Sequence, residues 1–438
     1  MKSAQNRHLS AVSIIRQFPF EEINEIATET EVDRRAKKIK GVNLMVDCIW
    51  AMLSSSQVSQ RLISTENALP VFSEIPVLQK YSFEQISHSS LSERLDKIKI
   101  PFFEKSYDLL ANKFRALVPD EYLNDMSVTR IDSTIVAETA NKLKKGFSTG
   151  IKKGVAGDRR QLKYTMAYNG LDVTAARVFT KPTYSADNAP ISKVVHESLR
   201  KRKDMSEFYV FDRGLKDVDD FKTIADHSQE KNVCFVGRLM KTRATECIED
   251  LIENDSVKGD NEVEITDDYI SYLRAKNSNK WDESQEYRII KVRFKNPRPK
   301  NPKGSRRHKR HYDPEMILIT NNMEAQAMDI VIAYRRRWSI EVFFKFLKQE
   351  LSFSHFISTS VNGIKVMLYL TLIVSLLIKI YALNNKMGMR ESKMAILNEL
   401  MKYQYEQVKI LQSENKRLSR EVKSLKSKLK QSKGSTDH

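Results

Sequence analysis

The sequence is poor in cysteine: Cys48, Cys234 and Cys247 are its only three in 438 residues, and none belongs to a Cys-x-x-Cys pair. This scarcity argues against a disulfide framework and against a zinc ribbon, and it is typical of a protein in a reducing cytoplasm. The N-terminus also lacks the basic, apolar and small-residue order of a signal peptide. We therefore expect a cytoplasmic protein.

Long hydrophobic runs are missing as well. The longest, Val366 to Ile378, has thirteen residues between Lys365 and Lys379, which is short for a helix that crosses a bilayer. It predicts a buried helix and no membrane partner.

Acidic residues are outnumbered, with 56 Asp and Glu against 74 Lys and Arg, so the formal net charge is +18. An excess of this size favours a polyanionic partner, nucleic acid first and an anionic membrane second. The length suffices for about two to four domains.

Residues 1 to about 120 read as a helical domain. Within it, Ser90 and Glu93 form a capping-box pattern at the start of a helix that runs to Ile98, after a short helix at Phe83 to Ile86. This pair resembles a helix-turn-helix unit, which would make residues 1–120 a DNA-binding domain. Packing within a plain helical bundle explains the same pattern equally well.

From about residue 125 the apolar spacing changes to the alternation of β-strands. Thr129 to Ala137 alternates and is rich in β-branched residues, which predicts a strand that carries Asp132. Asn169-Gly170, between two further alternating segments, predicts a hairpin. Phe208 to Phe211 is short and continuously apolar, as in a strand buried on both faces of a mixed sheet, and it ends at Asp212.

Residues 241–325 predict a β-rich insertion. Within it, Lys295 to His311 contains eight Lys or Arg residues, three prolines and no acid, so it cannot pack as a core. We expect this loop to bind DNA phosphates rather than to be merely solvated. The cations concerned are Arg306, Arg307, Lys309 and Arg310.

The segment Tyr334 to Glu350 has the spacing of one continuous helix and contains neither Gly nor Pro. At 3.6 residues per turn, Tyr334, Glu341 and Lys348 share a polar stripe, with Arg337 beside them. The stripe suggests a site for a metal or a phosphate, although an amphipathic helix with Glu341 paired to a nearby cation has the same pattern.

Asp132 lies within one predicted strand and Asp212 lies at the end of another, and a mixed sheet can place these two positions side by side. The helix that carries Glu341 can lie over the same edge of the sheet. Charges on central strands are costly unless they are paired or bind a metal. Carboxylates suit hard cations, so we expect Asp132, Asp212 and Glu341 to hold two Mg²⁺ or Mn²⁺ ions for in-line phosphoryl transfer.

These residues resemble the signature of the DDE transposases of bacterial insertion sequences, in particular the insertion sequence four group. Its Y-(2)-R-(3)-E-(6)-K pattern and both of its aspartates are present. The matching residues are Tyr334, Arg337, Glu341 and Lys348, with Asp132 in I-D-S-T and Asp212 in V-F-D-R-G. The resemblance covers about residues 125–385 and implies the α/β class, with an RNase H-like mixed-sheet catalytic core that the β-rich insertion interrupts.

The resemblance implies a transposase that binds double-stranded DNA at the ends of its element, cuts it with the three acids as catalytic residues, and joins it to target DNA, typically through hairpinned ends. Tyr334 and Arg337 would hold phosphates near the cleaved end, and Lys348 would offset charge beside the scissile phosphate. Trp338 matches an aromatic residue that stacks on a flipped base, although it could equally pack within its helix. Such a protein would be associated with the nucleoid.

Three other functions fit parts of the pattern. An RNase H-like nuclease would cut DNA without joining it. A domesticated DNA-binding protein would keep the fold without cleavage, and a transcription factor or scaffold would need the basic tail but not the three acids. Metal-dependent nicking of DNA that carries the element's ends would separate these possibilities.

The C-terminal residues 390–433 predict a coiled-coil dimerisation tail. Counted from Met394, nine of the twelve a and d positions of the heptads are apolar. Val at a with Leu at d favours two parallel strands, and Asn415 at an a position fixes the register. We therefore expect a homodimer, although a helix packed within one chain has the same pattern.

Overall fold

The computed structural model describes residues 9–65, 86–138, 143–148, 160–186, 188–201, 208–212, 218–230, 233–241, 245–251, 263–275, 280–295 and 315–434. Its contacts divide the chain into two compact units. Unit 1 comprises Met1–Leu117, Glu350–Ser352 and Asn362–His438, and unit 2 comprises Val118–Gln349 and Phe353–Val361. Unit 2 therefore holds all three predicted acids, and it ends before residue 385, the limit that the sequence suggested for the catalytic domain.

Unit 1 is helical. Its N-terminal helices are α1 (Ala11–Arg16), α2 (Phe20–Glu29), α3 (Gly41–Ser54), α4 (Gln60–Thr65), α6 (His88–Lys97) and α7 (Ile100–Arg115). Apolar residues at helical spacing give α7 a buried face that includes Phe103 and Phe114. Gly41 opens α3 beside Phe102, and a Cβ there would lie 2.9 Å from the ring.

Helix α6 begins one turn earlier than the capping-box pattern predicts. The Ser87 hydroxyl accepts a hydrogen bond from the Ser90 N–H at 3.2 Å and so caps the helix. The expected cap at Ser90 is therefore wrong, because the run of serines offers an earlier hydroxyl to the free N–H groups of the first turn. The short helix expected at Phe83 to Ile86 lies largely outside the described residues.

Helix α12 (Val361–Asn385) contains the longest apolar run and extends well beyond it, to 25 residues. By length and composition alone this helix could span a membrane. The expectation that its apolar run of thirteen residues is too short to cross a bilayer is therefore wrong. However, 89% of its most apolar window is buried inside the structure, as in the core helix of a globular protein. Its burial, and not its length, argues against a membrane span.

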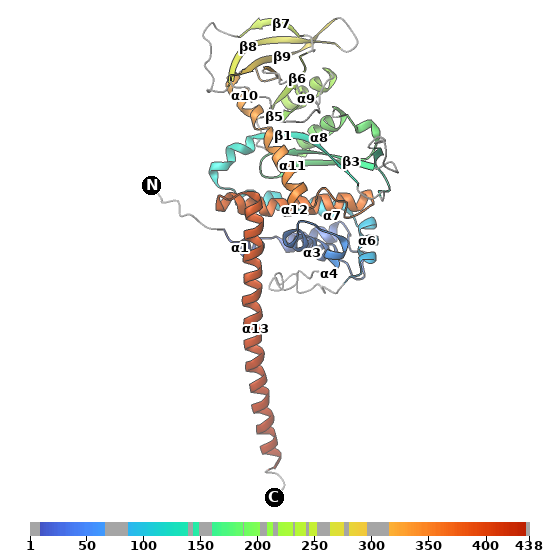
Figure 1. The fold of residues 1–438 in the computed structure, drawn as a ribbon, viewed down its shortest axis with the longest axis vertical. Coiled ribbons are helices and arrows are strands. Elements are labelled where there is room, and N and C mark those ends of the chain that lie inside the picture. Colours follow the sequence, from blue (N-terminus) through green and yellow to red (C-terminus); the bar gives the residue numbers. More distant parts are fainter. Residues whose placement is uncertain are drawn as a thin grey trace, which may run out of the picture. The chain divides into compact units, whose positions relative to one another are not determined.

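Helix α13 (Met389–Gly434) is a single helix of 46 residues that extends beyond the other helices of unit 1 (Figure 1). Its first turns bury Ile396 and Leu400. Lys393 is also buried, and its ammonium donates hydrogen bonds to the carbonyl oxygens of Ser55 at 3.1 Å and Glu350 at 2.5 Å. Further along, apolar side chains of the predicted heptads are exposed to solvent; they are Val408, Leu411, Leu418, Val422 and Leu425.

Unit 2 is built on one mixed sheet of ten strands. Its first strands are β1 (Val128–Ala137), β2 (Phe147–Ser148), β3 (Arg160–Tyr168), β4 (Val173–Phe179), β5 (Phe208–Phe211) and β6 (Cys234–Leu239). β1 runs antiparallel to β3 and parallel to β5, which runs parallel to β6. The predicted hairpin is confirmed as β3 and β4, and Gly170 between them has a φ of +99°, which glycine adopts most readily.

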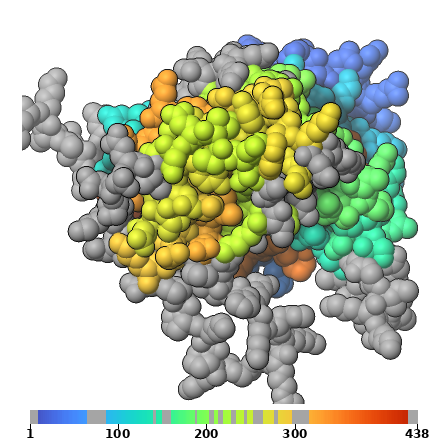
Figure 2. Space-filling view, turned by 90° about the horizontal axis from the view of Figure 1, so that it is seen from above, coloured from blue at the N-terminus to red at the C-terminus, as the bar shows by residue number. Residues whose placement is uncertain are grey.

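The predicted β-rich insertion continues this same sheet. β10 (Glu315–Thr320) pairs with β6, and β9 (Trp281–Phe294), β8 (Val263–Arg274) and β7 (Thr245–Asp250) follow in order. Figure 2 shows the outer surface of these strands in yellow-green to yellow. β7 was not predicted, because its side chains are mostly exposed and lack an apolar alternation.

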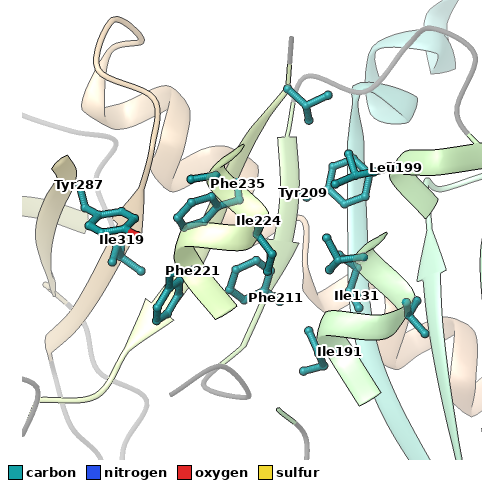
Figure 3. Close-up of a cluster of buried hydrophobic side chains, with 14 of the residues drawn as sticks. Ile131, Ile191, Leu199, Tyr209, Phe211, Phe221, Ile224, Phe235, Tyr287 and Ile319 are labelled. Atoms are coloured by element: carbon teal, nitrogen blue, oxygen red, sulfur yellow. The ribbon is translucent and has the colours of Figure 1, made fainter. Parts of the chain in front are cut away.

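Helices cover both faces of the sheet. α8 (Asn188–Lys201) and α9 (Val218–Glu230) pack on one face, where Phe221 of α9 meets Phe211 and Phe235 of the strands (Figure 3). α10 (Ala327–Arg335) packs on the other face, against Val210 and Val236. Because successive strand residues point to opposite faces, β5 is buried on both, as its apolar run predicts. The sheet edge at which β5 ends therefore has a rigid support.

Candidate active site

Asp132 and Asp212 lie at corresponding positions of neighbouring parallel strands. β1 and β5 pair with Ile131 opposite Phe211, and each of these two residues is followed directly by an aspartate. Since the carboxyl ends of parallel strands meet at one edge of a sheet, the register itself brings the two acids together. The prediction that these two acids are neighbours is confirmed.

The segment that carries Glu341 is two helices and not one. α10 ends at Arg335, and α11 (Trp338–Glu350) begins after a two-residue turn of Arg336 and Arg337. The expectation of one continuous helix from Tyr334 is therefore wrong. In the turn, the N–H groups of Ser339 and Ile340 bond to carbonyl oxygens three residues back, in the tighter pattern of a 3₁₀ turn.

Arg130, a fully buried residue of β1, accounts for this break. Its Nε donates a hydrogen bond to the carbonyl oxygen of Arg336 at 3.2 Å, and a side chain inserted in this way interrupts the helical ladder. Nη1 of the same guanidinium donates to the carbonyl oxygens of Val128 at 2.7 Å and Asp125 at 2.9 Å. Arg130 was not predicted as a site residue, although its position two residues before Asp132 places it on the same face of the strand.

Arg337 in that turn is the centre of the site. Its Nη2 lies 2.5 Å from Oε1 of Glu341 and 4.0 Å from Oδ2 of Asp212, and its Nη1 lies 3.4 Å from Oδ2 of Asp132. The simple pairing of Glu341 with Arg337, one of the sequence alternatives, is thus present. The same guanidinium also reaches both aspartates, so one positive charge is shared by three negative charges.

The other carboxylate oxygens also have partners. Oδ1 of Asp132 accepts a hydrogen bond from the Ser133 N–H at 2.7 Å, and Oδ1 of Asp212 accepts one from the Tyr334 hydroxyl at 3.2 Å. Five of the six carboxylate oxygens of the site therefore face a donor or a cation of this chain.

Burial decides the electrostatics of Asp132. It raises the pKa of this carboxyl to about 6, against the lowering effects of the Ser133 N–H and Arg337, and the nearby Glu341 and Asp212 add to the rise. For Arg337 the balance is opposite: burial lowers its pKa, but the carboxylates, Asp212 above all, outweigh burial and the net pKa is raised. Arg337 therefore stays charged, while Asp132 carries its charge at a cost.

A cleft of about 470 Å³ opens beside the acids. Asp132 and Glu341 line it together with Ser133, Thr134, Lys345 and Lys348. Lys348 donates a hydrogen bond to the carbonyl oxygen of Ile135 at 3.3 Å, and burial lowers its pKa. The cleft thus brings two acids and two lysines together, as a site for a metal-bound phosphate requires.

Trp338 is not among the residues that line this cleft. Trp338 opens α11 with 63% of its surface exposed, so it is not a packing residue of its helix. The cations of the basic loop lie outside the described residues; they are Arg306, Arg307, Lys309 and Arg310.

The chemistry of the donor set fits a hard divalent cation, since all three acids offer carboxylate oxygens. Their present arrangement does not close around an ion: in the described part of the chain, no three Asp, Glu, His or Cys side chains form a group that could hold one. The Arg337 guanidinium lies among the three acids instead. The acids therefore have the chemistry of a divalent-cation site, but a side chain of the protein occupies the position that a metal ion would take.

The family model of the transposase DDE domain matches residues 123–377, more than half of the chain, and the chain belongs to this family. This span contains the two strands, the turn and the helix that form the site. DDE transposases generally use divalent metal ions, which agrees with the donor set of the three acids.

Two individual proteins are similar to parts of this chain. A transposase-like protein of Sinorhizobium fredii (strain NBRC 101917 / NGR234), y4zB, is 31% identical over 74 residues, which are 17% of this chain and 21% of that protein. The chain thus matches about a fifth of that relative. The structure of a piggyBac transposase synaptic complex with hairpin DNA aligns with a TM-score of 0.42 at 11% identity, covering 92% of this chain and 82% of the other; a likeness at this level carries no argument.

Proposed function

We propose that this protein is a transposase of the insertion sequence four group that binds the ends of its element, cuts them and joins them to target DNA. The observation that carries the proposal is the meeting of Asp132, Asp212 and Glu341, from β1, the end of β5 and α11, around one cleft-side guanidinium. Their spacing with Tyr334, Arg337 and Lys348 in the sequence supports the group assignment.

The order of the strands supports an RNase H-like core. β4, β3 and β1 are antiparallel neighbours, and β5 and β6 continue the sheet in parallel to β1. Asp132 on β1 and Asp212 directly after β5 then fall at the same edge of the sheet. This placement is what a carboxylate site for two cations needs.

In the reaction, two Mg²⁺ or Mn²⁺ ions held by the three acids would supply the activated oxygen nucleophile and stabilise the charge of the transferred phosphoryl group. Lys345 and Lys348 line the cleft beside Asp132 and Glu341, where they would bind the phosphate that enters. Tyr334 donates to Asp212 and orients that carboxylate. Trp338 is exposed next to Arg337, as stacking on an extruded base at a hairpinned end requires.

The test is cleavage of a duplex that carries the inverted repeats flanking this reading frame. Wild-type protein should nick and then join it in Mg²⁺, whereas Asp132→Ala, Asp212→Ala and Glu341→Ala should do neither. Nicking without joining would instead identify an RNase H-like nuclease, and binding without nicking would identify a domesticated DNA-binding protein.

Unit 1 is proposed as the DNA-binding domain. A cleft of about 1020 Å³ lies between the turn Glu31–Lys40 and α6, and seven cations and two acids line it. Arg35, Lys37, Lys38 and Lys97 of this cleft are exposed and form no ion pair within the described residues. Unpaired cations in a cleft favour the phosphate backbone of DNA.

This cleft is built into the fold. Arg94 of α6 donates to the carbonyl oxygens of Val32 at 2.8 Å and Ile39 at 3.0 Å, and it forms an ion pair with Asp33 at 3.0 Å. These bonds fix the turn against the helix. The unpaired cations are therefore held on a rigid support, which lowers the entropic cost of binding a phosphate backbone.

Dimerisation through α13 is part of the proposal. Two element ends must be held while each is cut, and the exposed heptad residues of α13 offer an apolar seam to a second copy. Ile396 and Leu400, which are not a or d positions, pack within unit 1, whereas Met394 at an a position is 54% exposed. We place the protein on the nucleoid of the cytoplasm, where its substrate lies.

A further inference from the structure

We infer that Arg337 is the resting counter-cation of the acid cluster, and that a DNA phosphate must draw it away before the acids can take up divalent cations. This inference rests on the proposed function and concerns the order in which the same site is loaded. It begins from the three ion pairs of one guanidinium, at 2.5, 3.4 and 4.0 Å, to three acids from separate elements.

Occupied oxygens are the first reason. Five of the six carboxylate oxygens face Arg337, Tyr334 or the Ser133 N–H, and a guanidinium and a divalent cation repel each other when they approach the same oxygen. Three of these five face Arg337. Moving this one side chain therefore frees one oxygen on each acid at once.

The position of Arg337 is the second reason. It lies in the two-residue turn between α10 and α11, and its side chain is 13% exposed beside the cleft that Lys345 and Lys348 line. A guanidinium binds phosphate and carboxylate in the same bidentate geometry, so a phosphate that enters the cleft competes with the acids for Arg337. Arg130 holds the backbone of the turn through the carbonyl oxygen of Arg336, so the Arg337 side chain can move while α10 and α11 stay in place.

The consequence is a coupling between two ligands. DNA and the divalent cation should each raise the affinity for the other, because the phosphate removes the competitor of the cation. Without DNA, Arg337 would keep one oxygen of each acid occupied, so the free enzyme would take up little metal and would cleave little DNA.

The experiment measures Mn²⁺ binding by electron paramagnetic resonance of the free ion, with the full chain and a mixed-sequence duplex as the DNA probe. Wild type should bind Mn²⁺ weakly alone and roughly tenfold more tightly with the duplex, a change that corresponds to about 1.4 kcal/mol. Arg337→Ala should bind Mn²⁺ roughly tenfold more tightly than wild type without DNA, and the duplex should add little.

The matched control is Arg336→Ala. It removes the same charge from the same turn, but Arg336 approaches Asp125, at 3.9 Å, and not the three acids. Its Mn²⁺ affinity should stay at the wild-type value. Arg337→Lys, which keeps the charge but cannot bridge three carboxylates, should lie between wild type and Arg337→Ala and guards against misfolding of the alanine variant.

Equal Mn²⁺ affinities of wild type and Arg337→Ala without DNA would overturn the inference. A variant in which all three acids are replaced by alanine lacks the proposed metal ligands. The Mn²⁺ that it binds together with the duplex therefore measures the Mn²⁺ bound by the DNA itself. If that variant binds as much Mn²⁺ as wild type in the presence of DNA, the metal site of the proposed function fails; if it does not, only the role of Arg337 is at stake.

Discussion

The polar site of unit 2 and the exposed surfaces of unit 1 differ in how their groups are satisfied. In unit 2, three carboxylates share Arg337, and most of their other oxygens accept hydrogen bonds from the same chain. In unit 1, four cations of the cleft beside α6 make no ion pair within the described part of the chain, and the apolar seam of α13 faces solvent. Carboxylates held by partners within the chain are suited to metal-assisted catalysis, whereas exposed cations and apolar side chains are suited to binding another molecule.

Under the proposed function, this contrast would give the two units separate tasks. Metal-assisted chemistry requires a few groups held in fixed positions, which the buried sheet edge provides. Affinity for a duplex comes mainly from cations that exchange bound water and salt ions for phosphates, and these must be exposed. Variants of one unit should therefore alter one property and leave the other.

The largest effect is expected at the acids. Asp132→Ala, Asp212→Ala and Glu341→Ala should each slow cleavage of the end-bearing duplex by about a thousandfold or more, because the metal-held charge stabilisation of several kcal/mol is lost and each 1.36 kcal/mol is tenfold. Binding of the duplex in a gel shift should remain near the wild-type affinity. Glu324→Ala, at an exposed acid of unit 2, is the control and should cleave normally. Normal nicking by any of the three acid variants would remove that residue from the site.

The next effect concerns the cleft of unit 1. Neutralising Arg35, Lys37, Lys38 and Lys97 to glutamine should reduce the slope of log affinity against log salt by about 0.9 for each lost phosphate contact. The cleavage rate of saturated complexes should be unchanged.

The control for the cleft removes four cations from exposed positions of α13 and should leave the slope as it is; they are Lys402, Lys416, Arg417 and Lys423. A salt slope of wild-type size in the cleft variant would show that the unpaired cations of unit 1 are only solvated.

A smaller effect is expected from the pH dependence of stability. Because the pKa of Asp132 is raised from 3.8 to about 6 in the folded protein, its charge destabilises the fold, and this cost grows as the pH rises from about 4 to about 6. Asp132→Asn should therefore be more stable than wild type above pH 6, by up to ~3 kcal/mol, and equal to it near pH 4.

Melting temperatures in a chelating buffer at several pH values measure this difference. The control is Asp329→Asn, which removes a negative charge from α10, outside the carboxylate cluster. A constant difference between Asp132→Asn and wild type across the pH range would contradict the raised pKa.

The smallest effect is expected in α13, where the unpartnered seam would find its partner in a second copy. Asn415→Val should stabilise the dimer by about 1–3 kcal/mol, since it removes a polar amide from the seam, and should weaken the preference for two strands. Sedimentation of the full chain measures the oligomeric state, and thermal unfolding measures the stability. A monomeric wild type at high concentration would contradict the dimer.

Much of the fold of unit 2 was readable from local patterns. The alternation in Thr129–Ala137 predicted β1, Asn169-Gly170 predicted the hairpin, and the apolar run Phe208–Phe211 predicted a buried strand. Such patterns are reliable because side-chain periodicity and turn chemistry are properties of neighbouring residues. The start of α6 and the strand β7 escaped because a run of serines offers several caps, and an exposed strand needs no apolar alternation.

The sequence by itself predicted the three acids of the candidate site, through the spacing of Tyr334, Glu341 and Lys348 and through an aspartate within one strand and another at the end of a second strand. Only the tertiary structure decided which cation and which hydrogen-bond donors face these acids. The break before α11 arises from Arg130, 206 residues away from the carbonyl that it binds, and the break places Arg337 where it can reach three acids. Contacts between residues so far apart depend on the register of β1 with β5 and on the packing of α10, and no local pattern encodes them.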